Sequence, residues 1–447
     1  MAFALRLDAL DNDTKRKIST NLSIKPKKTQ YDSNPAPNYA FATNQYDNMI
    51  YLPLGQWKNY LDQFPHADKN YPHTNVKFTK QLYTIETDPK NRGRDQNIVA
   101  AEAIQQLKET HTTFISCFTG YGKTSLATYL FSMFKLKTAV LCHINTVKEQ
   151  WPDEITKFTE GTCKIQIVKG QTPLNPNADV YIFGIRKAAT MKREDLRDIG
   201  MVIIDEAHIC TVTAFTKSLL KFQPCYLVGL SATPDRNDGL HKLLYTYFGH
   251  KEEFIYRHEV KNFTVIKYKT QYKPDISYIV VHGKVVINWT TVITSLEENS
   301  HRQKELAQLA IDHPNEKIII LSKRLAQSNK IYDILETANE SVEKLTNNKK
   351  KWDRSKRILV ASLQKGGVGL NDPYLTMLIL GCDTKDVRQL EGRIRTTDNI
   401  VYHIVDDHPT LEKHWDICEK WYIKRGATIV SHKCENVQPK RYLSANK

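Results

Sequence analysis

The sequence predicts an α/β protein built from two parallel-sheet units in tandem. From about residue 96 onward, short apolar stretches alternate with polar or helical stretches. Parallel strands need a crossover between them that is usually a helix, so this alternation is typical of a parallel sheet covered by helices on both faces. The chain has 447 residues, which is too long for one ordinary core and predicts two large domains with a smaller addition.

The apolar stretches fall into two groups. A helical pattern over 98–107 leads into the first group, which comprises residues 113–117, 138–142, 180–183, 201–204 and 226–230. A second helical pattern over 295–311 leads into the other group, which comprises residues 317–321, 357–361, 375–380 and 400–405. We therefore expect a first α/β domain over 86–255 and a second α/β domain over 295–447.

The rest of the chain is expected to form a connector and an N-terminal accessory region. Residues 256–294 contain strand-like stretches without a helix between them, and they predict a connector with some β structure. Residues 1–85 predict an accessory region that is partly disordered, because residues 11–48 are polar and rich in Lys, Asn, Pro and Asp. The aromatic residues between 49 and 85 favour a small packed subdomain, and a base-stacking platform is the alternative.

Composition and charge restrict the class of protein. The formal net charge of +15 favours a polyanionic partner, with nucleic acid as the first candidate. The eight Cys include no CxxC pair, which fits free thiols in a reducing compartment. No apolar run approaches the roughly 20 residues needed to span a bilayer, so we expect a soluble intracellular protein without a membrane partner. A zinc site from His414, Cys418, His432 and Cys434 fits no common ligand spacing, and ordinary packing of these residues is favoured.

Residues 117–124 read Cys-Phe-Thr-Gly-Tyr-Gly-Lys-Thr and predict a phosphate-binding loop between a strand and a helix. Gly120 and Gly122 would let backbone N–H groups approach the phosphates closely. Lys123 is expected to reach the β- and γ-phosphates, and Thr124 to offer its hydroxyl to Mg²⁺. The neighbouring loop residues expected to contact the nucleotide are Thr119, Tyr121 and Ser125.

A second segment, residues 202–208, reads Val-Ile-Ile-Asp-Glu-Ala-His and predicts an apolar strand that ends in two carboxylates. We expect Asp205 to hold Mg²⁺ through water, and Glu206 to align and deprotonate the attacking water. An acidic pair at a helix start is often only a cap. Here the pair closes a buried strand about 80 residues after the loop, in an α/β unit. The two segments together therefore predict a nucleoside triphosphatase.

Further motifs resemble those of superfamily 2 helicases, and the resemblance covers roughly residues 90–430. Residues 94–96, Arg-Asp-Gln, resemble the motif that reads adenine, which implies this role for Gln96. Residues 140–151 resemble a segment that touches the nucleic-acid backbone. Residues 230–234, Leu-Ser-Ala-Thr-Pro, resemble the motif that couples ATP hydrolysis to strand movement. The resemblance implies a coupling role for His208, Ser231, Ala232 and Thr233.

Residues 236–238, Arg-Asn-Asp, narrow the resemblance to the XPB-like branch and imply nucleic-acid contacts at Arg236 and Asp238. In the second half of the chain, residues 360–371 resemble motif V and residues 389–395, Gln-Leu-Glu-Gly-Arg-Ile-Arg, resemble motif VI. The last part of the chain resembles helicases of phages and large DNA viruses, a group that includes the poxvirus-type transcript-release helicases.

Motif VI implies an arginine that acts on the γ-phosphate. Arg393 has the register of this finger, whereas the family's second arginine falls at Thr396. Arg395 is the nearest arginine to that second position and remains the alternative nucleotide contact. The resemblance also implies a coupling role for Gln389, and a ribose contact from Asn371 or Asp372.

The resemblance implies two RecA-like lobes that close on ATP and Mg²⁺ and move along DNA, single-stranded or forked, with RNA as the alternative. The basic loop over 347–357, with Lys349, Lys350 and Lys351, either contacts nucleic acid or forms a solvated turn. The partners implied are the transcription or replication machinery. The compartment expected is the host cytoplasm or the virion for a viral protein, and the nucleus otherwise.

Three other functions remain to be weighed. A duplex-DNA translocase could release transcripts with little unwinding. A non-hydrolysing ATP-binding subunit could recruit partners, but Lys123, Asp205, Glu206 and Arg393 are all present and argue against it. A nuclease would need a further acidic metal cluster, and none is evident in the sequence.

Overall fold

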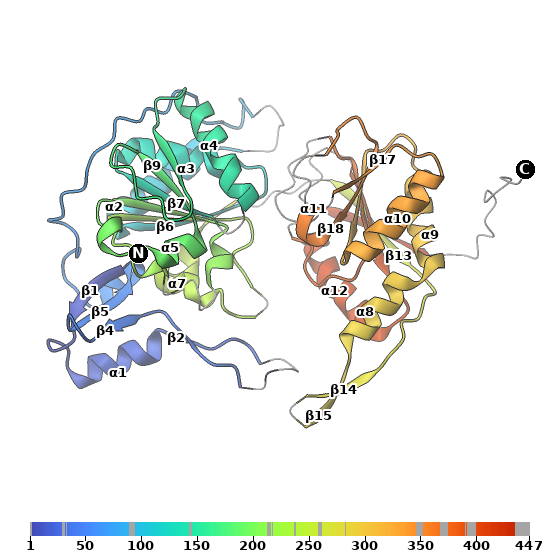
Figure 1. The fold of residues 1–447 in the computed structure, drawn as a ribbon, viewed down its shortest axis with the longest axis horizontal. Coiled ribbons are helices and arrows are strands. Elements are labelled where there is room, and N and C mark those ends of the chain that lie inside the picture. Colours follow the sequence, from blue (N-terminus) through green and yellow to red (C-terminus); the bar gives the residue numbers. More distant parts are fainter. Residues whose placement is uncertain are drawn as a thin grey trace, which may run out of the picture. The chain divides into compact units, whose positions relative to one another are not determined.

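The computed structural model (Figure 1) describes residues 2–28, 32, 34–88, 94–142, 145–211, 216, 218–236, 238–257, 262–281, 283–345, 352–366, 374–388, 390 and 399–433. The chain divides into two compact units, residues 1–259 and residues 260–447. Among these described residues, each unit contains a seven-stranded sheet, and every strand pairing in both sheets is parallel. The α/β class predicted from the sequence is confirmed.

The sheet of the first unit has the strand order β12-β6-β11-β10-β7-β9-β8. Its strands are β6 (Thr112–Cys117), β7 (Thr138–Cys142), β8 (Ile165–Val168), β9 (Val180–Gly184), β10 (Met201–Asp205), β11 (Tyr226–Ser231) and β12 (Ile255–Arg257). Its helices include α2 (Gln96–Thr110), α3 (Lys123–Phe134), α4 (Asn145–Thr159), α5 (Ile185–Thr190) and α7 (Lys242–Phe248).

Both faces of this sheet are buried, which explains why its strands are almost continuously apolar. Successive residues of a strand point to opposite faces. Accordingly, Ala139 and Leu141 of β7 join one apolar cluster, whereas Val140 and Cys142 join the other. The near absence of polar positions in the central strands is therefore the signature of a sheet covered on two sides.

The N-terminal residues pack onto the first unit. They form the antiparallel sheet β1-β5-β4, with β1 (Ala2–Arg6), β4 (Ala42–Asn44) and β5 (Met49–Pro53). They also form the helix α1 (Asn12–Asn21) and the strand pair β2 (Ser23–Ile24) and β3 (Asn38–Tyr39). Side chains from these elements share an apolar cluster with Leu240 and Leu243, which stand at the start of α7.

The region 1–85, expected as an accessory region, belongs to the first compact unit. The stretch 11–48 contains a regular helix, α1, whose first turn is capped by Asp11 Oδ1 accepting from Thr14 N at 2.6 Å. Among the aromatic residues, Trp57 is buried and donates from Nε1 to Thr110 O at 3.1 Å. Packing against α2 explains this ring better than base stacking.

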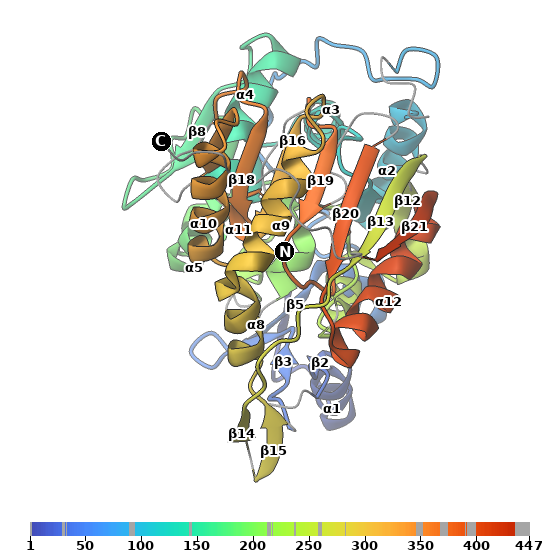
Figure 2. The same ribbon diagram turned by 90° about the vertical axis from the view of Figure 1, so that its right-hand side faces the viewer.

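The sheet of the second unit has the order β17-β18-β16-β19-β20-β13-β21, and Figure 2 shows most of these strands side by side. They are β13 (Phe263–Lys269), β16 (Ile318–Ser322), β17 (Val342–Leu345), β18 (Ile358–Ser362), β19 (Met377–Leu380), β20 (Asn399–Val405) and β21 (Ala427–Lys433). The helices are α8 (Trp289–Glu298), α9 (Ser300–Ile311), α10 (Leu325–Thr337), α11 (Leu363–Gly366) and α12 (Pro409–Lys424).

The prediction of a connector over 256–294 was wrong for its first part. β12 completes the first sheet beside β6, and β13 lies inside the second sheet between β20 and β21. The charges in β13 conceal this role in the sequence. Lys267 Nζ and Lys269 Nζ lie 2.7 Å and 2.6 Å from the two carboxylate oxygens of Glu412 on α12, so an interior strand can carry two lysines.

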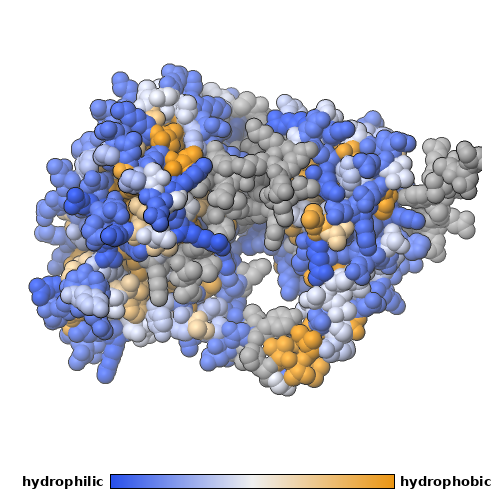
Figure 3. Space-filling view, viewed as in Figure 1, coloured by the Kyte–Doolittle hydropathy of each residue, from blue (hydrophilic) through white to orange (hydrophobic). Residues whose placement is uncertain are grey.

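The part of 256–294 that does stand apart is a hairpin of β14 (Tyr278–Val281) and β15 (Lys284–Ile287), which projects from the second unit in Figures 1 and 2. Several of its apolar side chains are exposed, with Val280 at 71% and Val285 at 70% of full exposure. They account for the orange patch at the lower edge of Figure 3.

Two sequence expectations concern membranes and metals. In the described part of the chain, no helix combines the length and the apolar character that crossing a bilayer requires. His414 Nδ1 lies 2.9 Å from both carboxylate oxygens of Asp383, and Cys418 Sγ donates to Thr384 O at 3.3 Å. Cys434 lies outside the described residues.

The position of β13 predicts a difference between two valines of the second unit. Val265 is fully buried in β13, so Val265→Ala should lower the free energy of unfolding by about 2 kcal/mol through lost burial and a cavity. Val285→Ala, in the exposed hairpin, should change it by less than about 0.5 kcal/mol. Urea unfolding of the full chain, followed by Trp fluorescence, measures both. Equal effects would mean that β13 is not part of the core.

Candidate ATP-binding and hydrolysis site

The predicted phosphate-binding loop joins β6 to α3 and has a backbone that requires its glycines. Gly120 and Gly122 have φ angles of 87° and 97°, a region that residues with a Cβ rarely adopt. A Cβ on Gly122 would also lie 2.2 Å from Gln96 Nε2. α3 begins at Lys123, so the loop ends in the first turn of a helix, where backbone N–H groups have no partner within the helix. This arrangement fits a phosphate chain.

The ammonium of Lys123 lies within the loop. Its Nζ donates to Cys117 O at 3.0 Å and to Phe118 O at 3.4 Å, both at the end of β6. Two backbone carbonyls therefore hold the charge where phosphate oxygens would replace them. Thr124 follows in the first turn of α3, and its side chain is half-buried, as is that of Thr119.

Gln96 and Ser125 brace the loop from behind. Gln96 is buried, and its Nε2 donates to Tyr121 O at 2.7 Å and to Ser125 Oγ at 3.3 Å. Its Oε1 accepts from Tyr83 N at 3.0 Å. Tyr121 itself donates from its hydroxyl to Asp95 O at 2.6 Å. Gln96 thus fixes the loop's conformation, and its contact with adenine stays a prediction.

Arg94 is a loop contact that the sequence reasoning did not identify. Its guanidinium is buried, pairs with Asp88, donates to Gly120 O at 3.1 Å and lies 4.6 Å from the ring centre of Tyr83. Its position two residues before Gln96 was the feature of the sequence that could have indicated this contact. Trp151 was missed as well, because its partner, Asp205, is 54 positions away in the sequence.

Asp205 ends β10 and is held in one orientation. Its Oδ2 accepts from Trp151 Nε1 at 2.9 Å and its Oδ1 accepts from Glu206 N at 3.0 Å. Burial, and then the charge of Glu206, raise the pKa of Asp205 above its ordinary value, while Lys123 acts in the opposite direction. A buried carboxylate whose charge is destabilised by burial and by a neighbouring carboxylate suits a divalent cation. Asp205 and Thr124 could hold Mg²⁺, which would polarise a phosphate oxygen.

Glu206 has two features that suit a general base. Its φ of 50° is a left-handed conformation that costs energy in a residue other than glycine and recurs at functional sites. Its Oε2 is buried and makes no hydrogen bond to any described residue. This oxygen lies 3.4 Å from His208 Nδ1. Buried carboxylate oxygens normally accept a hydrogen bond. Because this oxygen accepts none from the described residues, a water molecule could donate to it and lose its proton to it.

The structure brings His208 together with the Ser231–Thr233 segment. His208 Nδ1 and Ser231 Oγ are 2.7 Å apart, and Ser231 Oγ also accepts from Thr233 N at 3.1 Å. Ala232 lies between them, half-buried. The contact arises because β10 and β11 are parallel neighbours, with Asp205 opposite Leu230, so that both segments leave the same edge of the sheet.

Arg236 and Asp238, expected as nucleic-acid contacts, bind each other. Arg236 Nε lies 3.0 Å from Asp238 Oδ1, and the pairing lowers the pKa of Asp238. Arg236 Nη1 donates to His208 O at 3.0 Å. Both groups are thus engaged inside the protein, and their contact with nucleic acid stays a prediction. The remaining candidates lie outside the described residues: Lys349, Lys350, Lys351, Asn371, Gln389, Arg393 and Arg395.

Residues 90–236 match the family model described as "Type III restriction enzyme, res subunit". Protein 161L of Invertebrate iridescent virus 6, named as a helicase, is 28% identical over 97% of this chain and its own full length. Protein 055L of Frog virus 3, also named as a helicase, is 30% identical over 77% of this chain and 80% of its own. The "DNA 3'-5' translocase XPB2" of Sulfurisphaera tokodaii is 27% identical over 40% of this chain and 39% of its own.

A solved structure shares the fold. A variant of S. cerevisiae Dbp5, bound to RNA and ADP BeF3, is 14% identical, with a TM-score of 0.52 over 75% of this chain and 89% of its own. The two units are therefore RecA-like. Together with the viral relatives, these findings show that the chain belongs to the family of helicases, ATP-hydrolysing enzymes that act on nucleic acid, found in large DNA viruses.

Proposed function

We propose that the protein is a DNA helicase or translocase that uses ATP and Mg²⁺ to move along single-stranded or forked DNA. One observation carries the proposal: Glu206, the predicted base, lies beside His208, which contacts Ser231 in the segment predicted to couple hydrolysis to movement. When the γ-phosphate beside Glu206 is lost, a change in the position of Glu206 can therefore be transmitted to Ser231 through the single side chain of His208.

The chemistry follows from the residues around the loop. Lys123 and the N–H groups at the start of α3 bind the phosphates, and Thr124 and Asp205 are the residues that would hold Mg²⁺. Glu206 Oε2 orients the attacking water and accepts its proton. Arg393 supplies positive charge to the γ-phosphate as charge develops there in the transition state. Asn371 and Arg395 are proposed as further nucleotide contacts, and Gln389 as a coupling residue.

DNA is proposed over RNA because the relative of the XPB type is named as a DNA translocase. RNA is the second candidate, since the solved neighbour was bound to RNA. A duplex translocase that releases transcripts with little unwinding fits the same site, because phosphate contacts carry no sequence information. We further propose that the protein works with the viral transcription or replication machinery, in the host cytoplasm or the virion.

The nucleic-acid class is tested by ATPase rates of the purified protein with single-stranded DNA, duplex DNA, forked DNA and RNA of equal length. We expect single-stranded or forked DNA to give the strongest stimulation. A stronger response to duplex DNA, without strand separation, would indicate the translocase instead. Stimulation by RNA alone would reject DNA as the substrate.

The role of Glu206 is tested by Glu206→Gln, which keeps the shape of the side chain and removes the base. ATP turnover should fall by about 100-fold or more, while ATP still binds, so the variant should accumulate on DNA when ATP is present. Lys123→Ala is the matched control, and it should lose nucleotide binding as well. Filter binding of labelled ATP separates the two outcomes. If Glu206→Gln fails to bind ATP, the residue is structural.

Arg393 and Arg395 are predicted to differ. Arg393→Ala should lower the DNA-stimulated kcat by about 100-fold or more, because a finger acts on charge that develops in the transition state. Arg395→Ala should cost clearly less, and Thr396→Arg should be tolerated. Steady-state kinetics with saturating single-stranded DNA measure all three variants. Equal losses at the two arginines would show that both reach the phosphate, and a harmless Arg393→Ala would remove motif VI from the reaction.

A further inference from the structure

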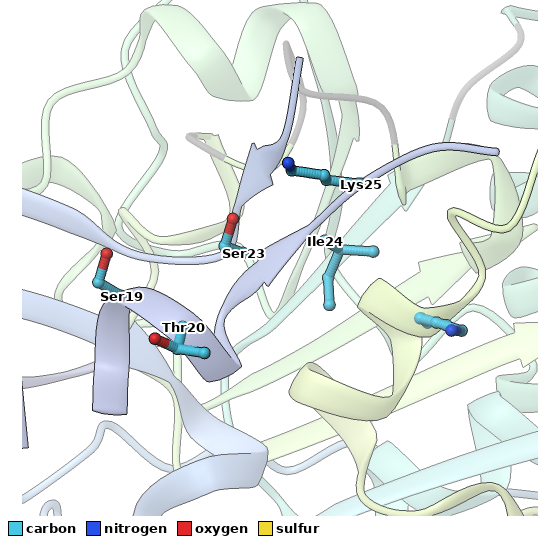
Figure 4. A pocket seen from close by; sticks show the side chains of 6 residues that line it. Ser19, Thr20, Ser23, Ile24 and Lys25 are labelled. Carbon is cyan, nitrogen blue, oxygen red and sulfur yellow. The ribbon is translucent and has the colours of Figure 1, made fainter. Parts of the chain in front are cut away.

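A surface pocket of about 440 Å³ lies where the N-terminal region meets α7. Its lining residues are Ser19, Thr20, Ser23, Ile24, Lys25 and Lys242. Figure 4 shows Ser19 and Thr20 on α1, Ser23 and Ile24 on the strand β2 that follows it, and Lys25 directly after that strand. The lining thus offers three hydroxyl groups and two ammonium groups, and none of the six residues is acidic.

The charge around this pocket suits a phosphodiester backbone. Residues 14–28 include Lys15, Arg16, Lys17, Lys25, Lys27 and Lys28, and no Asp or Glu. The pocket lies at the C-terminal end of α1, whose dipole contributes roughly half a negative charge. Lys25 and Lys242 carry two full positive charges, so attraction for an anion prevails. An acidic protein segment is the competing occupant, but hydroxyl and ammonium donors match phosphate oxygens more directly.

The pocket is joined to the segment that follows Ser231–Thr233. Lys27, two residues after Lys25, donates its backbone N–H to Asp238 O at 2.7 Å. The stem of Lys27 also covers Gly239, where a Cβ would lie 3.1 Å from Lys27 Cγ. Ile18 and Leu22, on either side of the hydroxyl residues, share an apolar cluster with Leu240 and Leu243. The backbone of Lys27 and this apolar cluster therefore connect the pocket wall directly to Asp238 and the start of α7.

From Asp238, hydrogen bonds continue to the predicted base. Asp238 binds Arg236, with Nε to Oδ1 at 3.0 Å, and Arg236 Nη1 donates to His208 O at 3.0 Å. His208 Nδ1 then lies 2.7 Å from Ser231 Oγ and 3.4 Å from Glu206 Oε2. All of these contacts are made within the first unit. The contacts of Arg236 with His208 and of His208 with Ser231 join residues that are 28 and 23 positions apart.

We propose that this pocket binds a phosphate of the nucleic-acid backbone. We further propose that Asp238, Arg236 and His208 transmit the effect of this binding to the position of Glu206. The inference rests on the proposed function, because it explains how nucleic acid would stimulate ATP hydrolysis. Lys25 and Lys242 bind the phosphate. Asp238 and Arg236 are positioning residues that hold His208 beside Glu206.

The binding step is tested with the full chain carrying Lys25→Gln and Lys242→Gln together. The control pair is Lys164→Gln and Lys169→Gln, two exposed lysines near β8 whose loss changes the net charge equally. Fluorescence anisotropy of a labelled single-stranded oligonucleotide is measured over a range of salt concentrations. The plot of log affinity against log salt has a negative slope, and the magnitude of this slope should decrease by about 1 to 2 in the pocket variant and stay unchanged in the control. Equal slopes in both variants would overturn the proposal.

The source of the phosphate is distinguished by competition. Inorganic phosphate, added at constant ionic strength, should not displace the oligonucleotide from the wild-type protein, because a backbone presents several phosphates at once. Displacement that occurs in the wild type and is absent from the pocket variant would mean that the pocket takes a free phosphate. Unchanged DNA binding in the pocket variant, with lost binding of an acidic peptide, would mean that the occupant is a protein.

The coupling step is tested by Asp238→Asn, which removes the charge that holds Arg236. At a saturating concentration of oligonucleotide, where a change in affinity no longer affects the rate, the stimulation of kcat by the oligonucleotide should fall. A purely structural defect would instead lower the unfolding midpoint, and Asp238→Glu should restore stimulation. If the wild-type protein shows no stimulation by any nucleic acid, the proposed function itself fails. If it shows stimulation that Asp238→Asn retains, only the coupling fails.

Discussion

Parallel pairing of β6, β11 and β10 is the constraint on which the candidate site depends. Parallel strands end at the same edge of a sheet, so the loop after Cys117, the carboxylates at 205 and 206 and the segment from Ser231 all emerge together. Each strand is buried on both faces, and its register cannot slip without exposing apolar side chains. The core therefore sets the spacing of the reacting groups.

The site places polar groups where the sheet would otherwise favour apolar ones. Asp205 is oriented by Trp151, Gln96 braces the loop, and Arg94 is buried with Asp88. Burying such groups costs free energy unless each finds a partner. Two buried atoms of the site make no hydrogen bond among the described residues, Arg94 Nε and Glu206 Oε2, and Glu206 also has a left-handed backbone. Departures of this kind gather at functional sites.

The second unit shows how charge can be hidden in a core. Arg302 and Asp406 are both buried, and Arg302 Nε lies 2.8 Å from Asp406 Oδ1 while Nη1 donates to Gly381 O at 3.0 Å. Breaking such a pair leaves an uncompensated charge and is strongly destabilising. The lysines of β13 are matched by Glu412 in the same way. A charged residue in this unit can therefore lie in its core.

The sequence by itself determined the α/β class, the two parallel sheets and the position of the loop and the acidic pair. These features follow from local patterns: apolar runs, glycines before a helix, and carboxylates after a strand. The tertiary structure alone decided that residues 1–85 belong to the first unit, that β13 is an interior strand, and that Arg236 binds Asp238 and the backbone at His208. Most of these features depend on a partner that is distant in the sequence. A local sequence pattern carries no information about which distant residue will neutralise a charge or cover an apolar face.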